Sequence, residues 1–293
     1  MDKNIFKVKG SYVNGQWFNS KNRYDIFNPS NGEKLSDVPI SDKKELELAV
    51  DSAKKAQLIW SKTSLIERAN ALEKLAKKIL EKEEEFALID TYDSGNALTG
   101  MRKDVKETVN NIRYFCGLVR EVKGETFSME KNHLNFTRYQ PYGVVLKINP
   151  FNHPFRFCVE KIAAPLLMGN SLIIKNSEQA PISSLRFCEL LEDIFPKGLI
   201  NVVTGGPDNG KFLVEHPDIK RIAVIGSVNT GIAIAKSAAP LLKNISLELG
   251  GKNPIIVFDD ADPEFAANLA IKGMNLNRQG QSCSSTSRIL LHK

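Results

Sequence analysis

The sequence predicts an α/β fold built around a parallel sheet. From residue 144 onward, short continuous apolar runs alternate with stretches of helical periodicity. Continuous apolar strands separated by helices are typical of parallel sheets buried on both faces, and such sheets bind ligands at the carboxyl ends of their strands. The apolar runs are Val144–Ile148, Leu172–Ile174, Ile200–Val203, Ile222–Ile225 and Ile255–Phe258, and the helical stretches lie near 154–168, 183–195, 206–214, 230–238 and 263–275.

The residues before this alternation are expected to form short strands and then helices. Asn-Gly and Asn-Pro turns interrupt strand-like pieces up to residue 40, and residues 41–120 have helical periodicity. Ser64 and Glu67 match a capping box, in which two side chains satisfy free backbone N–H groups at a helix start. The next helix is expected to end at Asp93–Asn96. The helix after the capping box should bury one face, made of Leu65, Ala69, Leu72, Ala76 and Ile79.

Composition and charge are those of an ordinary soluble globular protein. The length of 293 residues allows one large or two modest domains. Hydrophobic residues make up 42% of the chain and charged residues 25%, which supplies enough apolar side chains for a core. No apolar run approaches a membrane-spanning length, and Met1–Phe6 lacks the long apolar segment of a secretory signal. We therefore expect a cytoplasmic protein without a membrane partner. The net charge of +6 comes from lysines interleaved with acids, which argues against nucleic-acid binding, where basic charge is clustered.

The four cysteines fall into two kinds of surroundings. Cys116, Cys158 and Cys188 lie in apolar helical patterns, where a free cysteine behaves as a small buried hydrophobe. Cys283 lies in the segment Gly-Gln-Ser-Cys-Ser-Ser, and its small polar neighbours predict an accessible nucleophile rather than a buried structural cysteine. There is no CxxC pairing and no nearby histidine spacing, so we expect no metal site.

A single carboxylate precedes a double glycine upstream of this cysteine. Glu248 stands between Leu247 and Leu249 and just before Gly250. Apolar surroundings disfavour the charged form of a carboxylate, which makes it a better proton acceptor. The alternative is a strand-end carboxylate paired with a lysine. With Cys283, Glu248 predicts acyl chemistry through a thioester, which water activated by the carboxylate then cleaves.

These segments, with others upstream, resemble the NAD(P)-dependent aldehyde dehydrogenase family. Residues 150–154 (Pro-Phe-Asn-His-Pro) resemble the family's Pro-Trp-Asn-Phe-Pro element, and residues 175–178 (Lys-Asn-Ser-Glu) resemble its Lys-Pro-Ser-Glu. Residues 226–231 (Gly-Ser-Val-Asn-Thr-Gly) resemble its Gly-Ser-Thr loop, and residues 12–17 and 27–33 resemble its first segments. The motifs follow the family's order from about Tyr12 to the last residue.

The resemblance implies a domain organisation. Residues 1–124 and 144–247 would form a Rossmann-like NAD-binding domain with a parallel sheet, and 125–143 a bridging β-hairpin. Residues 248–293 would be the N-terminal part of an α/β catalytic domain whose remainder is absent. The family's chains are considerably longer, so the segment that grips the nicotinamide ribose and the strands used for oligomer contacts are expected to be missing.

The resemblance also implies a reaction, the oxidation of an aldehyde to a carboxylate with NAD. Cys283 would attack the carbonyl to give a thiohemiacetal that loses hydride, and Glu248 would activate water to hydrolyse the thioester. The amide of Asn152, otherwise a cap or turn residue, would donate to the oxyanion together with the backbone N–H of Cys283. His153 and Arg278 stand where the family usually has phenylalanine and asparagine, and we assign no role to His153.

The cofactor contacts implied by the resemblance lie after the predicted strands. Lys175 and Glu178 would bind the adenosine ribose, where the carboxylate repels a 2′-phosphate and favours NAD over NADP. A solvated i,i+3 charge pair is the alternative. Ser227 and its loop could present hydroxyl and N–H groups to a pyrophosphate, although the loop lacks the Lys-Ser/Thr of a P-loop. The predicted cofactor residues are Ile148, Phe151, Lys175, Glu178, Gly210, Gly226, Ser227, Leu249 and Gly250.

Other functions are open at this point. The chain could be a catalytically inactive truncated remnant or a dinucleotide-binding module, or one half of a split enzyme. The expected partners are a small-molecule aldehyde and either further copies of the chain or a missing C-terminal half.

Overall fold

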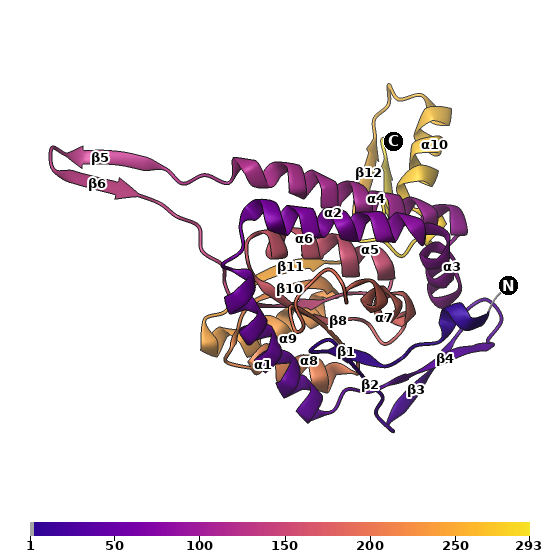
Figure 1. Ribbon diagram of the computed structural model, residues 1–293. Helices are drawn as coiled ribbons and strands as arrows, with labels where there is room; N and C mark the ends of the chain where they lie inside the picture. The colour runs from indigo at the N-terminus through magenta and orange to yellow at the C-terminus, as the bar shows by residue number, and fades with distance from the viewer. Residues whose placement is uncertain (1–2) are drawn as a thin grey trace.

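A seven-stranded sheet forms the centre of the computed structural model, which describes residues 3–293 (Figure 1). The strand order is β11-β10-β7-β8-β9-β1-β2. The strands from β11 to β9 run parallel, and β1 and β2 complete the sheet in antiparallel pairing. Met1 and Asp2, part of the leading segment considered above, lie outside the described residues. The strands are β1 (Ser11–Val13), β2 (Gln16–Phe18), β7 (Val144–Ile148), β8 (Ser171–Lys175), β9 (Ile200–Val203), β10 (Ile219–Gly226) and β11 (Asn244–Leu249).

The predicted parallel α/β fold is confirmed, with two differences among the strands. The run at 255–258 forms β12 (Pro254–Val257), but β12 pairs with β13 (Arg288–Leu291) in a separate two-stranded sheet. The sheet also contains β11, which was not among the predicted apolar runs. This strand lies at the edge of the sheet and alternates polar with apolar residues, so it lacks the continuous apolar signal of a strand buried on both faces.

The order of the strands reverses at β7. From β7 the chain proceeds outward through β8 to β9, and it then returns to place β10 and β11 on the other side of β7. Open parallel sheets bind ligands at the carboxyl ends of the strands where this order reverses. Ile148 ends β7 and Gly226 ends β10, so both strands end at the expected ligand crevice.

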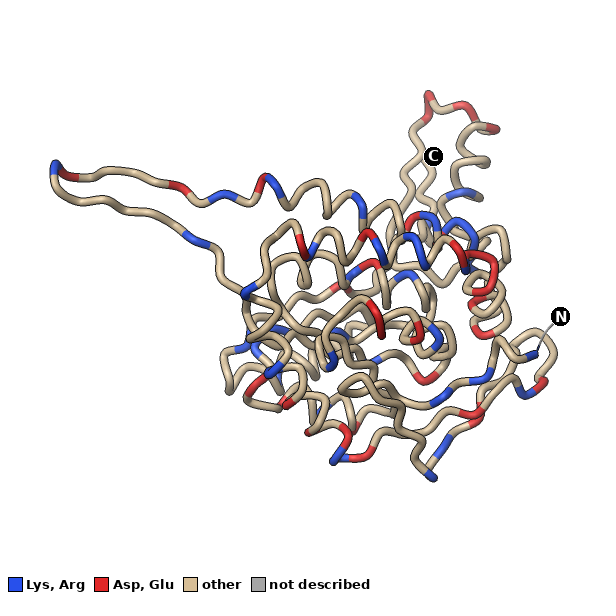
Figure 2. Tube along the Cα trace, in the orientation of Figure 1, with Lys and Arg blue, Asp and Glu red and all other residues tan. Residues whose placement is uncertain are grey.

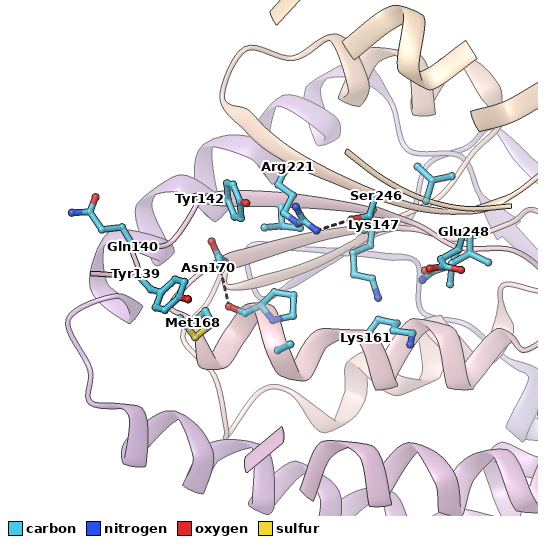
Figure 3. Close-up of a pocket in the computed structure, with 17 residues that line it drawn as sticks. Tyr139, Gln140, Tyr142, Lys147, Lys161, Met168, Asn170, Arg221, Ser246 and Glu248 are labelled. Atoms are coloured by element: carbon cyan, nitrogen blue, oxygen red, sulfur yellow. Dashed lines mark hydrogen bonds between the residues drawn. The ribbon is translucent and has the colours of Figure 1, made fainter. Parts of the chain in front are cut away.

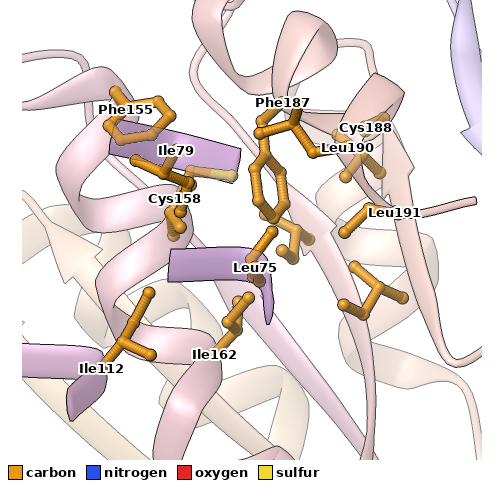
Figure 4. Packing of buried hydrophobic residues seen from close by; sticks show 14 of the residues in the cluster. Leu75, Ile79, Ile112, Phe155, Cys158, Ile162, Phe187, Cys188, Leu190 and Leu191 are labelled. Carbon is orange, nitrogen blue, oxygen red and sulfur yellow. The ribbon is translucent and has the colours of Figure 1, made fainter. Parts of the chain in front are cut away.

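Helices cover both faces of the sheet around two separate cores. Helices α1 (Lys43–Trp60), α8 (Pro207–Glu215) and α9 (Val228–Ala238) pack on the face that carries Leu146 and Val224. The other face carries Val145 and Ile174, and Figure 4 shows Phe155, Phe187 and Leu75 packed in its core. That core is built by α2 (Leu65–Glu81), α3 (Glu83–Ser94), α4 (Leu98–Leu118), α5 (Pro154–Val159), α6 (Ala163–Leu167) and α7 (Ile182–Phe187).

The helices begin and end largely as their local sequence predicts. At the start of α2, Glu67 N donates to Ser64 Oγ at 3.2 Å and Ser64 N donates to the Glu67 carboxylate at 2.7 Å, which confirms the capping box. Helix α3 ends at Gly95 with φ of 75°, a backbone conformation that glycine adopts without strain. The stretch near 154–168 is two short helices joined by a 3₁₀ turn, because Pro165 cannot donate the N–H that a continuous helix requires.

Two small units extend beyond the main body, whereas a third two-stranded sheet packs against its core through Ile26 and Val38. The hairpin of β5 (Thr126–Glu130) and β6 (His133–Phe136) projects away from it, whereas β12, β13 and α10 (Pro263–Gly273) form a unit near the last residue (Figure 1). Strands β3 (Arg23–Phe27) and β4 (Lys34–Pro39) form this third two-stranded sheet.

Basic and acidic residues are interleaved along the chain (Figure 2). Within residues 3–293, no helix has both the length and the apolar character needed to cross a membrane.

Candidate active site

Cys283 lies on an exposed loop between α10 and β13. The other cysteines, Cys116, Cys158 and Cys188, are buried, so all four placements confirm the sequence prediction. The side-chain amide of Asn253 donates to the backbone oxygen of Cys283 at 2.8 Å, and Asn253 directly precedes β12. The thiol is therefore accessible on a loop with a tethered backbone, while its nucleophilic role stays a prediction.

The segment before Cys283 contains two residues in the left-handed region of backbone space. Asn275 has φ of 52° and Gln279 has φ of 56°. Such conformations are costly for residues other than glycine, roughly 1–3 kcal/mol each, and persist where surrounding contacts impose them. One such contact is the hydroxyl of Ser285, which donates to the backbone oxygen of Met274 at 3.0 Å. The path of the cysteine loop is thus set by its contacts rather than by local preference.

Asn152 lies in the turn between β7 and α5 and contacts the cysteine loop. Its side-chain Nδ2 donates to the backbone oxygen of Gln281 at 2.8 Å, across 129 residues of sequence. Asn96 holds the turn from the other side by donating to the backbone oxygen of Asn152 at 3.0 Å. An amide nitrogen carries two hydrogens, so Asn152 keeps one for a ligand while the other holds the loop of Cys283. The structure therefore brings the predicted oxyanion donor and the nucleophile loop together.

Two buried carboxylates fix the helices that follow β7 and β8. Asp90 on α3 accepts from the backbone N–H of Phe155 at 3.0 Å, and Asp93 accepts from that of Ile182 at 2.9 Å. These N–H groups lie in the first turns of α5 and α7, where a helix offers no internal partner. Burial raises the pKa of Asp90 to about 7. These contacts were not predicted from the sequence, because nothing local marks an acid that caps a distant helix.

Glu248 lies on β11 in surroundings that differ from the expectation. Its neighbours Leu247 and Leu249 do not enclose it, and the Glu248 side chain is exposed. The prediction of apolar surroundings is wrong because successive residues of a strand point to opposite faces, so both leucines point away from the face of Glu248. The carboxylate instead lines a cavity of about 570 Å³ that also receives Lys147 and Lys161 (Figure 3). No ion pair of Glu248 is formed within residues 3–293.

A second cavity, of about 580 Å³, opens where the strand order reverses. Its walls come from the carboxyl ends of β7, β8 and β10 and from helices α8 and α9. Seven of the nine predicted cofactor residues line this crevice, namely Ile148, Phe151, Lys175, Glu178, Gly210, Gly226 and Ser227.

The other two predicted cofactor residues support the crevice without lining it. The backbone N–H of Gly250 donates to the oxygen of Gly226 at 3.2 Å. Leu249 packs against Gly231 of α9, where an added Cβ would lie 2.8 Å from the leucine side chain. These contacts hold the Gly226 loop against β11. Leu249 and Gly250, which were predicted to bind the cofactor directly, do not line the cavity.

The charged groups of the crevice have defined partners. Lys175 Nζ lies 3.0 Å from Glu178 Oε2, and the Glu178 side chain is 40% exposed. The ion pair between Lys175 and Glu178 is thus present, and both residues line the cavity. The second carboxylate oxygen of Glu178 takes no part in this ion pair. Ser227 caps α9 by accepting from the backbone N–H of Thr230 at 3.1 Å. The helix start faces the same cavity, an arrangement suited to an anionic group.

A buried group of charges beside Asn152 was not predicted. Asp104 on α4 is 1% exposed and lies 2.6 Å from both His153 Nδ1 and Arg278 Nη2. The only local signal was that His153 and Arg278 both depart from the family pattern. Residues 3–293 contain no group of three or more His, Cys, Asp or Glu side chains placed to hold a metal ion.

The fold and the placement of these residues agree with comparisons to known proteins. The sequence pattern described as the aldehyde dehydrogenase family matches residues 17–293, and the chain belongs to that family. It is 38% identical over 286 residues to an aldehyde dehydrogenase of Talaromyces stipitatus, covering 96% of this chain and 56% of the relative. It is 37% identical to the chloroplastic betaine aldehyde dehydrogenase of Beta vulgaris, covering 96% and 59%.

Solved structures give the same result. A betaine aldehyde dehydrogenase of Staphylococcus aureus in complex with NAD⁺ matches with a TM-score of 0.94 and 36% identity, over 98% of this chain and 60% of that one. An NAD⁺ complex of an aldehyde dehydrogenase from Bacillus cereus matches with a TM-score of 0.94 and 34% identity, over the same shares. The chain thus spans somewhat more than half the length of the relatives it matches.

The raised pKa of Asp90 predicts a specific pH dependence of stability. The ordinary pKa of an aspartate is about 3.9, so between about pH 4 and pH 7 the folded chain retains a proton that the unfolded chain has released. The stability contributed by protonated Asp90 is complete below this window and is lost as the pH rises through it. Asp90→Asn keeps an acceptor for Phe155 N. It should therefore raise the free energy of unfolding at about pH 8, by roughly 1–4 kcal/mol, and leave it nearly unchanged at about pH 4.

Urea unfolding at several pH values, followed by circular dichroism, measures this difference. Asp51→Asn, at an exposed position of α1, is the matched control and should show no pH-dependent gain. A difference between Asp90→Asn and the unaltered chain that is constant over this pH range would contradict the assignment.

The exposure of the cysteines predicts which thiol reacts. Burial raises the pKa of Cys116 and of Cys158 to about 11 and that of Cys188 well above its usual range, so little reactive thiolate forms there. Brief treatment with iodoacetamide should label Cys283 at least about 100-fold faster than these three. Peptide mass mapping gives the rates, and Cys283→Ser should abolish the fast phase. Comparable labelling of any buried cysteine would show the prediction to be wrong.

Proposed function

We propose that the chain carries the cofactor site, the nucleophile and the general base of an NAD-dependent aldehyde dehydrogenase, which converts an aldehyde, NAD⁺ and water to a carboxylate and NADH. One observation carries this proposal. Phe151 lines the crevice of the predicted cofactor residues, and the next residue, Asn152, bonds to the loop of Cys283. The cofactor crevice and the nucleophile loop therefore meet at two consecutive residues. Membership of the family supports the same reaction.

The crevice suits a dinucleotide in size and in chemistry. Glu178 would accept hydroxyl hydrogens of the adenosine ribose beside Lys175, and the start of α9 at Ser227 would receive the pyrophosphate. The NAD⁺ complexes of the Staphylococcus aureus and Bacillus cereus relatives support NAD as the cofactor. When bound, NAD supplies the acceptor for the hydride.

The chain's own residues would act in the following order. Cys283 Sγ, as the thiolate left when its proton passes to solvent, adds to the aldehyde carbon. The free N–H of Asn152 Nδ2, with the backbone N–H of Cys283, stabilises the resulting oxyanion. Loss of hydride leaves a thioester on Sγ. Glu248 then removes a proton from water as the water attacks the thioester carbon, which releases the carboxylate and restores the thiol.

The domain boundaries follow from this assignment. We infer that residues 1–124 and 144–247 form the NAD-binding domain, that 125–143 form a bridging hairpin, and that 248–293 belong to the catalytic domain. An aldehyde is the proposed substrate, and association with further copies of the chain is part of the proposal.

A second candidate function is dinucleotide binding without turnover. The observation that favours it is the exposure of Cys283 and Glu248, since positioning of reacting groups in a closed site supplies much of the rate enhancement of enzymes. Binding of NAD by a chain whose Cys283 is not acylated by an activated ester would support this function over the first.

The place of Glu178 predicts a preference between cofactors. Isothermal titration calorimetry should show tighter binding of NAD than of NADP, because the carboxylate accepts from ribose hydroxyls and repels a 2′-phosphate. Glu178→Ala should weaken NAD binding by roughly tenfold, the effect of about 1.4 kcal/mol, and narrow the difference between the two. Glu81→Ala, at an exposed position of α2, is the control. Tighter binding of NADP by the unaltered chain would refute the ribose assignment.

The role of Glu248 can be tested without hydride transfer. With 4-nitrophenyl acetate, Cys283 should be acylated in a burst of nitrophenolate, and a slower steady state should report hydrolysis of the thioester. Glu248→Gln should preserve the burst and slow the steady state by roughly 100-fold or more, the usual contribution of a general base. Cys283→Ser should remove the burst. Equal loss of both phases in Glu248→Gln would count against the base role.

A further inference from the structure

Asp104 connects the two segments on which the proposed chemistry depends. Its Oδ2 lies 2.6 Å from His153 Nδ1, and its Oδ1 accepts from Arg278 Nη2 at 2.6 Å. His153 directly follows Asn152, and Arg278 precedes Cys283 by five positions on the same loop. One carboxylate from α4 therefore holds both the turn of the oxyanion donor and the loop of the nucleophile.

The contact fixes the protonation pattern of the histidine. A carboxylate is only an acceptor, so at 2.6 Å the Nδ1 of His153 must carry the hydrogen and donate it to Asp104. The approach of Arg278 Nε to the same nitrogen at 3.3 Å is then not a hydrogen bond, since both atoms carry hydrogen. The imidazole ring is oriented by Asp104, and the ring also packs against Phe157 with centroids 4.9 Å apart.

The position of Arg278 is equally constrained. Its Nη2 also donates to the backbone oxygen of Gly100 at 3.2 Å, and a Cβ added at Gly100 would lie 2.0 Å from Arg278 Nη1. Any larger residue at this position of α4 would require the guanidinium to shift from its place. Arg278 is 6% exposed. Burial of its charge is favourable only where the guanidinium contacts its partner Asp104. The side chain thus ties the cysteine loop to one place on α4.

We propose that Asp104 is a positioning residue that sets the relative placement of Asn152 and Cys283. It acts through His153 on the turn after β7 and through Arg278 on the loop before the cysteine. The direct bond from Asn152 Nδ2 to Gln281 O, at 2.8 Å, is the contact that this arrangement keeps in place. The proposal rests on the proposed function, because it concerns how the oxyanion donor reaches the carbonyl attacked by the thiol.

Two reagents separate positioning from general damage to the fold. Iodoacetamide alkylates a thiol without forming an oxyanion, whereas 4-nitrophenyl acetate forms one on attack. The double variant Asp104→Leu and Arg278→Met replaces the most buried ion pair by apolar side chains of similar size, which is often neutral for stability. Arg156, whose Nη1 lies 3.5 Å from Asp104 Oδ1, keeps its ion pair with Glu160 in this variant. We expect Cys283 in this variant to be alkylated within about twofold of the unaltered rate but acylated at least about tenfold more slowly, towards the loss of roughly 100- to 1000-fold caused by removing one oxyanion donor.

Coupling to Asn152 completes the test. Asn152→Ala should slow acylation by itself, and adding Asp104→Leu and Arg278→Met to it should slow acylation little further, because residues that act through one another are not additive. His153→Phe, which keeps the ring packing but loses the bond to Asp104, gives the same comparison if the double variant does not fold by circular dichroism. Asp51→Asn is the control for both reagents.

The possible outcomes distinguish failure of the positioning role from failure of the proposed function. Equal slowing of alkylation and acylation, or fully additive effects with Asn152→Ala, would overturn the positioning role while leaving the proposed function intact. Unchanged acylation in the folded double variant and in His153→Phe would overturn it as well. Acylation of the unaltered chain that is absent, or independent of Cys283, would overturn the proposed function and this inference together.

Discussion

The pairing of β7 with a parallel strand on each side is the constraint on which the site depends. Val144, Val145 and Leu146 are buried, and buried backbone N–H and C=O groups must be paired, so β8 and β10 together fix where β7 lies and where it ends. The turn after Ile148 therefore begins at a defined place at the reversal of strand order. The crevice opens on one side of this turn, and Asn152 reaches the cysteine loop from it.

Helices α3 and α4 hold this turn in place with buried acids. Asp90 accepts from the first turn of α5, Asp93 from that of α7, and Asp104 from His153 and Arg278. Removing a carboxylate from water is costly unless hydrogen bonds replace its hydration. Each acid is therefore stable only while the segment it binds stays in place. Helices α3 and α4 and the segments that their acids bind thus stabilise each other.

The predicted cofactor crevice and the cavity lined by Glu248 lie on different faces of the sheet. The crevice with Lys175 and Ser227 is covered by α8 and α9, whereas Glu248 faces the cavity beside α6 together with Lys147 and Lys161. Burial lowers the pKa of Lys147 to about 7, and the wall of this cavity also includes apolar side chains such as Val145 and Met168. Both faces meet at the carboxyl edge of the sheet, where Asn152 and the cysteine loop are in contact.

The sequence by itself determined the strands that are buried on both faces, the capping box of α2 and the exposure of Cys283, because each depends on neighbouring residues. The residues that line most of the crevice were implied by the resemblance to the family and not by a local pattern. Continuous apolar runs, a serine three residues before a glutamate, and small polar neighbours are local signals. Only the tertiary structure decided the rest. The edge strand β11 and the surroundings of Glu248 depend on which face of the strand is covered. The group around Asp104 joins residues 49 and 174 positions apart, and no local pattern records such a contact because the buried charges find their partners only when distant segments pack together.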